Sequence, residues 1–243
     1  LMKTQLPYLL IALFSVGLHA QNTLSGNLNG WEPANAEIIT GMNAPIQIGA
    51  IAENGEFTIE LTKDFVEKTL QGIDGFNENS DAWKSSLSTI EKAFACNSET
   101  VALENADQPI LSVSNLGNYG LANIEDRKMY GSFMIVNNKD FAEGFRAFGK
   151  YENKKGYYLD WYYFEKAATV KGECSMESYA LNQEESYIGK NIYDLNFKPG
   201  WNIVKYEVLE LFEDRDGKTY EALVLWETLD EMPADVQYIY FAK

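Results

Sequence analysis

The ten residues AENGEFTIEL, at positions 52–61, constrain the fold more than any other stretch of the chain. Asn54 and Gly55 form a dipeptide that tolerates the two positive φ angles of a tight hairpin turn. After this turn Phe57, Ile59 and Leu61 alternate with polar residues, which is the two-residue period of a half-buried strand. The stretch therefore predicts an antiparallel hairpin with one face packed on a core.

Similar runs of β-forming residues, bounded by turn residues, recur along the chain. A second hairpin is predicted at Asp216-Gly217, between two long runs of this kind. Strands are expected at residues 36–40, 46–51, 110–114, 131–137, 157–164, 169–174, 191–197, 201–212, 219–227 and 236–241.

Between residues 62 and 94 the spacing of the apolar residues changes from every second position to the three- and four-residue spacing of a helix. Thr62 can cap the start of a first helix, and Gly72 suits its end. Ser80 or Asp81 can cap a second helix, whose apolar stripe would cover a sheet. That stripe consists of Trp83, Leu87, Ile90 and Phe94. Residues 138–149 fit either a helix or a strand.

These patterns together predict a mainly β fold. Four segments are expected: a signal peptide at 1–20, an N-terminal sandwich-like β unit at 21–61, a two-helix insertion at 62–96, and a C-terminal unit at 97–243. We expect the last unit to be an antiparallel sheet, a sandwich or a barrel-like structure.

The first 20 residues predict export. Lys3 precedes an apolar run from Leu6 to Leu18, and Ala20 is a small residue that suits a cleavage site. The run is too short to span a membrane, and no cysteine follows it that could carry a lipid anchor. We therefore expect an exported protein of the periplasm, the cell surface or the medium, with no transmembrane segment after cleavage.

Charge and histidine content exclude several classes of function. The formal net charge is −16, so the surface repels polyanions and nucleic acid is not an expected partner. The only histidine, His19, lies in the predicted signal peptide. This excludes from the mature protein any Ser–His–Asp or Cys–His catalytic unit and any metal site with a histidine ligand. No cofactor is predicted.

Cys96 and Cys174 are the only two cysteines. Two cysteines in an exported chain favour a disulfide, which could stabilise the fold by about 4 kcal/mol on the chain-entropy model. Sequence spacing does not establish the geometry of a bond, so two buried free thiols are the alternative.

The stretch GYYLDWYYF, at 156–164, holds the densest group of aromatic residues. Successive side chains of a strand point to opposite faces, and the row with Leu159 and Trp161 is the better core face. The other row brings together Tyr158, Asp160 and Tyr162 as candidate ligand contacts. Flat rings beside hydrogen-bonding groups suit a sugar. The alternative is a strand covered on both faces, with its phenol oxygens reaching solvent or backbone partners.

Two acidic loops have residues that could hold calcium. The candidate ligands are Asp214, Asp216 and Glu221 in the first loop, and Asp74, Asn77, Asn79 and Asp81 in the second. The first loop lacks the regular ligand ladder of a calcium loop, and in the second Ala82 stands where such a loop needs glycine. A hairpin tip and a helix cap explain the two loops, so no metal site is predicted.

Two parts of the chain resemble uncharacterised secreted proteins of the bacterial envelope, which have an N-terminal β-sandwich-like unit and a C-terminal β-rich unit. The matching positions are Leu24, Gly26, Trp31, Pro33, Asn54, Gly55 and Phe57 in the first part, and Lys171, Gly172, Cys174, Lys198, Gly200, Trp201 and Asn202 in the second. These motifs are structural turns and strands, so the resemblance implies a fold and a location but no catalytic residue.

The sequence thus leads to a non-enzymatic binding or structural protein of the bacterial envelope. Its expected partner is a small molecule, a glycan or an envelope protein. An accessory subunit of an outer-membrane assembly is one alternative. A histidine-free glycoside hydrolase that uses two carboxylates is another, although no pair of acids stands out.

Overall fold

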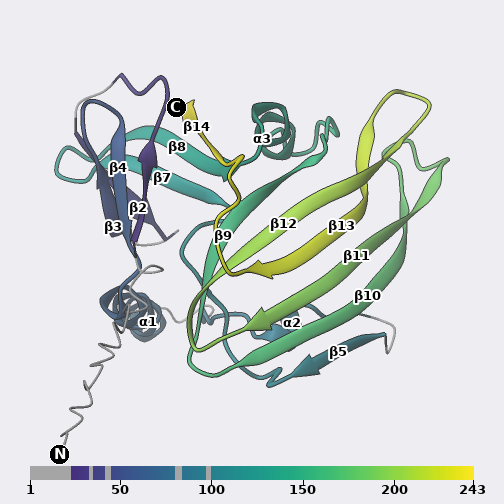
Figure 1. Ribbon diagram of the computed structural model, residues 1–243, viewed down its shortest axis with the longest axis horizontal. Coiled ribbons are helices and arrows are strands. Elements are labelled where there is room, and N and C mark those ends of the chain that lie inside the picture. Colours follow the sequence, from purple (N-terminus) through teal and green to yellow (C-terminus); the bar gives the residue numbers. More distant parts are fainter. Residues whose placement is uncertain (1–22, 33–34, 42–44, 80–83, 97–99) are drawn as a thin grey trace, which may run out of the picture.

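The computed structural model describes residues 23–32, 35–41, 45–79, 84–96 and 100–243. Within these residues the chain forms fourteen strands and three helices, which confirms the predicted mainly β fold (Figure 1). All fourteen strands belong to one hydrogen-bonded sheet that is mostly antiparallel. No helix in the described residues is both long enough and apolar enough to cross a membrane.

The first group of strands curls around a core. Its members are β1 (Thr23–Asn27), β2 (Ala36–Thr40), β3 (Ile46–Ile51), β4 (Glu56–Glu60), β7 (Asn118–Asn123), β8 (Lys128–Val136) and β14 (Gln237–Ala242). They lie in the order β1-β4-β3-β2-β7-β8-β14. Tyr238 of β14 reaches β1, where its hydroxyl donates to the Ser25 carbonyl at 3.3 Å. The side chains of β14 and β1 therefore bring the two ends of this group together around buried residues such as Phe57 and Phe133.

The second group forms a broad twisted sheet. Its members are β5 (Val101–Glu104), β6 (Leu111–Ser112), β9 (Gly156–Phe164), β10 (Ala168–Tyr179), β11 (Ser186–Phe197), β12 (Gly200–Glu213) and β13 (Thr219–Leu229). The order is β9-β12-β13-β11-β10-β5, and only β11 and β13 pair in parallel among the described strands. Val136 of β8 pairs with Tyr158 of β9 and so joins the two groups.

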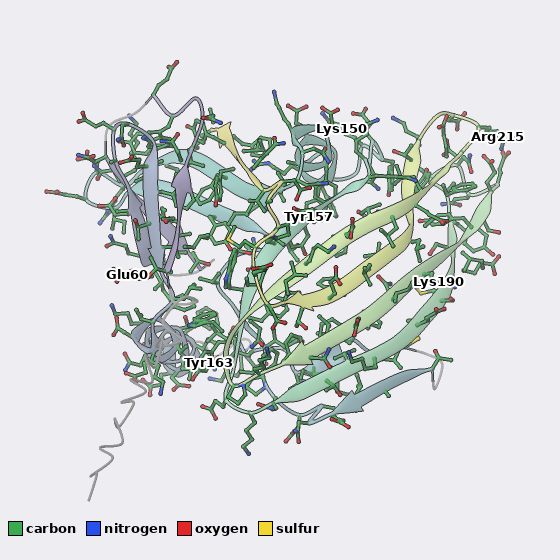
Figure 2. All side chains as sticks on the ribbon, in the orientation of Figure 1. Glu60, Lys150, Tyr157, Tyr163, Lys190 and Arg215 are labelled. Carbon is green, nitrogen blue, oxygen red and sulfur yellow. A yellow bond between two sulfur atoms is a disulfide. The ribbon has the colours of Figure 1, made fainter. Side chains whose placement is uncertain are left out.

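Strand β9 is buried on both faces. Leu159 and Trp161 are 0% and 3% exposed and pack in the core shared with the N-terminal strands, which confirms the predicted core row. Tyr157 and Tyr163, labelled in Figure 2, mark the two ends of this row. We call the opposite face, which carries Tyr158, the packed face, because the last two helices cover it.

Helix α1 (Lys63–Asn79) begins where the sequence predicts and ends later. The Phe65 backbone N–H donates to Thr62 Oγ1 at 3.3 Å, which confirms the cap. The predicted end at Gly72 is wrong, because Gly72 does not have the positive φ of a helix-ending glycine. An interior glycine costs a helix about 1 kcal/mol but does not stop it.

The predicted second helix is reduced to α2 (Ile90–Ala93). Its N-cap is Thr89, while Ser80, Asp81 and Trp83 lie outside the described residues. The apolar stripe does not act as one surface. Leu87 packs against the N-terminal core, whereas Ile90 and Phe94 pack on the packed face of the broad sheet.

Two open questions of the sequence are resolved by the structure. Residues 138–149 contain a helix, α3 (Lys139–Arg146), capped by Asn138, whose Oδ1 accepts from the Phe141 N–H at 2.7 Å. Cys96 and Cys174 form a disulfide with a Cα–Cα distance of 5.7 Å. The bond ties the segment after α2 to β10.

The predicted boundaries at residues 61 and 96 stay a prediction. Strands β2 and β7, which lie on either side of these boundaries in the sequence, pair directly.

Candidate functional site

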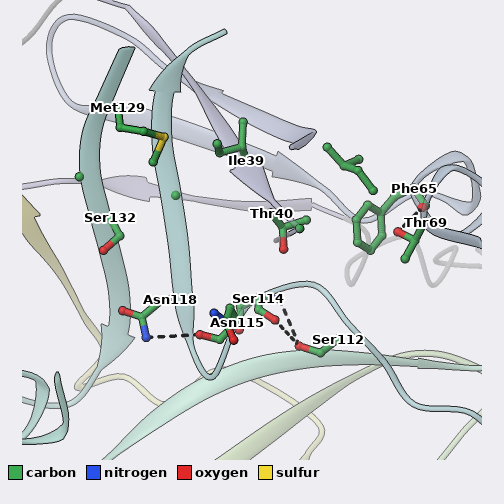
Figure 3. A pocket seen from close by; sticks show the side chains of 14 residues that line it. Ile39, Thr40, Phe65, Thr69, Ser112, Ser114, Asn115, Asn118, Met129 and Ser132 are labelled. Carbon is green, nitrogen blue, oxygen red and sulfur yellow. Dashed lines mark hydrogen bonds between the residues drawn. The ribbon is translucent and has the colours of Figure 1, made fainter. Parts of the chain in front are cut away.

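A groove of about 480 Å³ lies where the N-terminal strands, the first two turns of α1 and the loop after β6 meet (Figure 3). The lining residues are Ile39, Thr40, Gly41, Ile46, Phe65, Thr69, Ser112, Ser114, Asn115, Asn118, Gly120, Met129, Gly131 and Ser132. None of these described residues carries a charge. We call this feature the groove.

One wall of the groove is polar and is fixed by a tight turn. The backbones of Asn115 and Asn118 donate to each other's carbonyls at 3.1 and 3.0 Å. The residues between them, Leu116 and Gly117, have φ angles of 49° and 75°, the signature of a type I′ hairpin turn. Ser114 Oγ accepts from the Gly117 N–H at 2.8 Å. The backbone of this wall and the Ser114 hydroxyl are therefore held in place before any ligand arrives.

The opposite side of the groove is apolar. Phe65 is 4% exposed and Ile39 is 8% exposed, whereas Met129 on β8 is 40% exposed. Thr69 lies one turn after Phe65 on α1, and its hydroxyl donates to the Phe65 carbonyl at 2.9 Å. A ligand in the groove would meet hydrocarbon on one side and hydrogen-bonding groups on the other.

A buried carboxylate stands directly behind the polar wall. Asp160 Oδ2 lies 2.6 Å from Ser112 Oγ, and Oδ1 accepts from the Trp161 N–H at 2.8 Å. Burial raises the pKa of Asp160 to about 6, although hydrogen bonds from Ser112, Ser114 and Trp161 lower it in part. The groove is thus connected to a group that changes protonation near neutral pH.

The hydroxyl of Ser112 lies between two acceptors. Ser112 Oγ is 2.9 Å from the Ser114 carbonyl as well as 2.6 Å from Asp160, and it accepts from the Ser114 N–H at 3.2 Å. A hydroxyl has one proton to donate. When Asp160 is protonated it can donate to Ser112, and Ser112 can then donate to Ser114. When Asp160 is ionised, the Ser112 hydroxyl can donate its proton either to the carboxylate or to the Ser114 carbonyl, but not to both.

Tyr119 also points toward this network. It is 0% exposed, and its hydroxyl has no hydrogen-bond partner among the described residues. Burial raises the pKa of the Tyr119 hydroxyl well above its usual range, and the nearby charge of Asp160 raises it further, while Ser114 lowers it. The hydroxyl thus lies close to Ser114 without the geometry of a hydrogen bond.

The three residues that the sequence predicts as ligand contacts share the packed face of β9, but each has a different environment. Tyr158 is 2% exposed and stacks on Tyr206 with ring centroids 5.0 Å apart. Asp160 is 2% exposed and binds Ser112, while Tyr162 stacks on Phe197 at 6.4 Å. Only Asp160 adjoins the groove, through Ser112, and contact of the three with a ligand stays a prediction.

The calcium candidates do not form a common site in the described residues. Asp214 accepts from the N–H groups of Asp216 and Lys218 and from the Tyr220 hydroxyl, so it holds the hairpin tip together. Glu221 instead accepts from Tyr206 on the neighbouring strand. Asp81 lies outside the described residues.

Sequence reasoning missed the residues of the groove wall. The only local signal is the run Ser112–Asn118, with two serines, two asparagines and a glycine within seven residues. Such a run predicts a turn but says nothing of Phe65 or Met129, which reach the same groove from distant parts of the chain. A search of protein-family models, curated proteins and solved structures finds no match to this chain.

Proposed function

We propose that this chain is an exported binding protein that holds a small neutral saccharide in the groove. One observation carries the proposal: a row of hydroxyls and amides on a fixed turn faces an apolar side, and no described lining residue is charged. A sugar ring offers both chemistries, because its hydroxyls need hydrogen-bond partners and its C–H faces pack on hydrocarbon.

The lack of charge in the groove decides between ligand classes. An anionic ligand would find no cation among the described lining residues and would approach a protein with a net charge of −16. Arg146 donates to the side chains of Asn118 and Ser132 in the wall but is not itself a lining residue. A cationic ligand would lose its hydration without gaining a carboxylate partner in the groove. An uncharged, hydroxyl-rich ligand incurs neither cost.

The same geometry favours binding over hydrolysis. Glycosidases place two carboxyl groups on either side of the scissile bond. Here no described lining residue is a carboxylate, and Ser112 separates Asp160 from the ligand space. The export half of the proposal rests on residues 1–20, which lie outside the described residues.

A binding experiment on residues 21–243 tests the proposal. Calorimetry against a panel of neutral mono- and disaccharides should find at least one ligand. The variant Asn115→Ala should weaken its binding by about fivefold, because each lost hydrogen bond costs roughly 1 kcal/mol. Asn115 is suited to this test, since it is exposed and its side chain makes no hydrogen bond among the described residues.

A matched control uses another exposed asparagine. Asn196 on β11 lies away from the groove, so Asn196→Ala should leave the affinity unchanged. The proposal is rejected if no neutral saccharide binds at about 10 mM, or if the two variants weaken binding equally.

A further inference from the structure

A second pocket, of about 270 Å³, opens on the packed face of the broad sheet, at the end of the sheet where Figure 2 labels Lys190. We call it the tyrosine pocket. Its lining residues are Ala95, Cys96, Cys174, Ser175, Met176, Ser178, Gly189, Lys190, Asn191, Tyr193, Tyr206, Glu221 and Val224. They come from β10, β11, β12, β13 and the segment that the disulfide holds against β10.

The tyrosine pocket contains a partly buried carboxylate without a countercharge. Tyr206 donates its hydroxyl proton to Glu221 Oε2. No described lysine or arginine forms an ion pair with Glu221. Lys190 lines the same pocket, but its Nζ is bound to Glu173 at 3.0 Å. A desolvated carboxylate in this state is costly unless a cation pairs with it.

Two aromatic rings of the pocket are held rigidly. Tyr206 and Tyr193 are each 8% exposed. Trp226 meets the Tyr206 ring edge-on at 4.8 Å, and Phe94 meets the Tyr193 ring edge-on at 5.4 Å. Rings fixed in this way provide π faces without an entropic cost on binding.

There is also room for a ligand beside the carboxylate. A Cβ atom built at Gly189 would meet nothing closer than 3.7 Å, the distance to the Met176 carbonyl. Asn191 and Ser178, both half-buried, add polar groups to the wall.

We infer that the tyrosine pocket binds a small organic ammonium cation, with Glu221 as its counterion and the rings of Tyr193 and Tyr206 against its alkyl groups. A carboxylate beside fixed aromatic rings is the recognition chemistry of such cations. The net charge of −16 draws cations toward the surface. This site is separate from the groove and does not depend on a saccharide.

Choline and its uncharged isostere 3,3-dimethylbutan-1-ol test the inference, because the two have nearly the same shape. Calorimetry on residues 21–243 with the disulfide intact should show choline binding at least about tenfold tighter than the isostere. Equal affinity for the two, or no choline binding at about 10 mM, would overturn the inference.

Two variants locate the charge and the pocket. Glu221→Gln should lose about tenfold in choline affinity, whereas Glu213→Gln, an exposed glutamate at the end of β12, should lose none. Gly189→Leu should block the pocket at a position where the added Cβ atom makes only ordinary van der Waals contacts, the shortest of them 3.7 Å to the Met176 carbonyl. It tests the site even if Glu221→Gln fails to fold. If choline affinity falls equally in all three variants, or in none, the cation does not bind in this pocket.

Discussion

Asp160 Oδ2 and Ser112 Oγ lie 2.6 Å apart, and this pair joins the interior of the protein to the wall of the groove. Asp160 comes from the middle of β9 and Ser112 from the short strand β6 that pairs with it. The groups around the carboxylate are Ser112, Ser114 and the phenols of Tyr119, Tyr158 and Tyr162. None of these neighbours is a cation that would favour the charged form.

Asp160→Asn should change how stability depends on pH. The pKa of Asp160 is about 6 in the folded protein and 3.8 for an unperturbed aspartate. The folded state therefore holds this proton to higher pH than the unfolded chain. The stability from protonated Asp160 is fully present below pH 3.8 and is lost as pH rises through about 6. The loss is about 3 kcal/mol at most.

Asparagine keeps an acceptor for the Trp161 N–H and supplies a donor for Ser112 at every pH. The variant should therefore gain up to about 3 kcal/mol relative to the wild type between about pH 4 and pH 7, measured by urea unfolding at several pH values. Asp230→Asn is the control. Lys198 lowers the pKa of Asp230, so stability from that pair is lost as pH falls. If the free energy of unfolding of Asp160→Asn depended on pH as it does in the wild type, Asp160 would not titrate in this range.

Tyr119→Phe should leave the free energy of unfolding unchanged or raise it by up to about 1 kcal/mol. The substitution removes a buried hydroxyl that has no partner among the described residues, so nothing is lost with it. Tyr220→Phe is the matched control, because the Tyr220 hydroxyl accepts from the Leu181 N–H and donates to Asp214 Oδ2. It should cost about 1–3 kcal/mol in urea unfolding. A similar cost at Tyr119 would mean that its hydroxyl is hydrogen-bonded to Ser114.

Local patterns predicted most strands because they depend on neighbouring residues alone. The expected strands at 36–40 and 46–51 match β2 and β3, and the turn at Asn54-Gly55 leads into β4 as predicted. Residues 138–149 could not be resolved locally. Their helix is favoured because Phe141 and Phe145 then pack beside Tyr158, which lies in another part of the chain.

The candidate site could not be predicted to the same extent. The alternation in β9 correctly separates Leu159 and Trp161 from Tyr158 and Asp160. It cannot show what covers the second row. Part of that cover is Gly117, where a Cβ atom would lie 2.7 Å from the Tyr158 ring. The groove depends on contacts of this long-range kind, since Ile39, Phe65, Ser112 and Met129 meet only in the folded chain.

Leu116→Asn should stabilise the protein. Leu116 is 65% exposed and has a φ of 49°, a conformation that costs an ordinary side chain about 1 kcal/mol. Asparagine tolerates it and would create the Asn-Gly pair preferred in type I′ turns. The free energy of unfolding should rise by about 0.5–1 kcal/mol, measured by urea unfolding. Leu116→Ala lacks the short polar side chain that lets asparagine adopt this conformation, so it should not gain. Equal gains in both variants would point to the exposed apolar surface instead of the backbone.

Replacing both cysteines by serine should cost about 4 kcal/mol of stability on the chain-entropy model, because Cys96 and Cys174 are 78 residues apart in sequence. Without the bond the unfolded chain expands, so the dependence of unfolding on urea should also steepen. Both cysteines line the tyrosine pocket. If the segment after α2 leaves β10 in the double variant, the affinity for choline should fall as well. Urea unfolding of the double variant and of the reduced wild type measures the first two effects and should give the same result for both. A cost below about 1 kcal/mol with an unchanged slope would mean that packing of Ile90 and Phe94 alone holds this segment on the sheet.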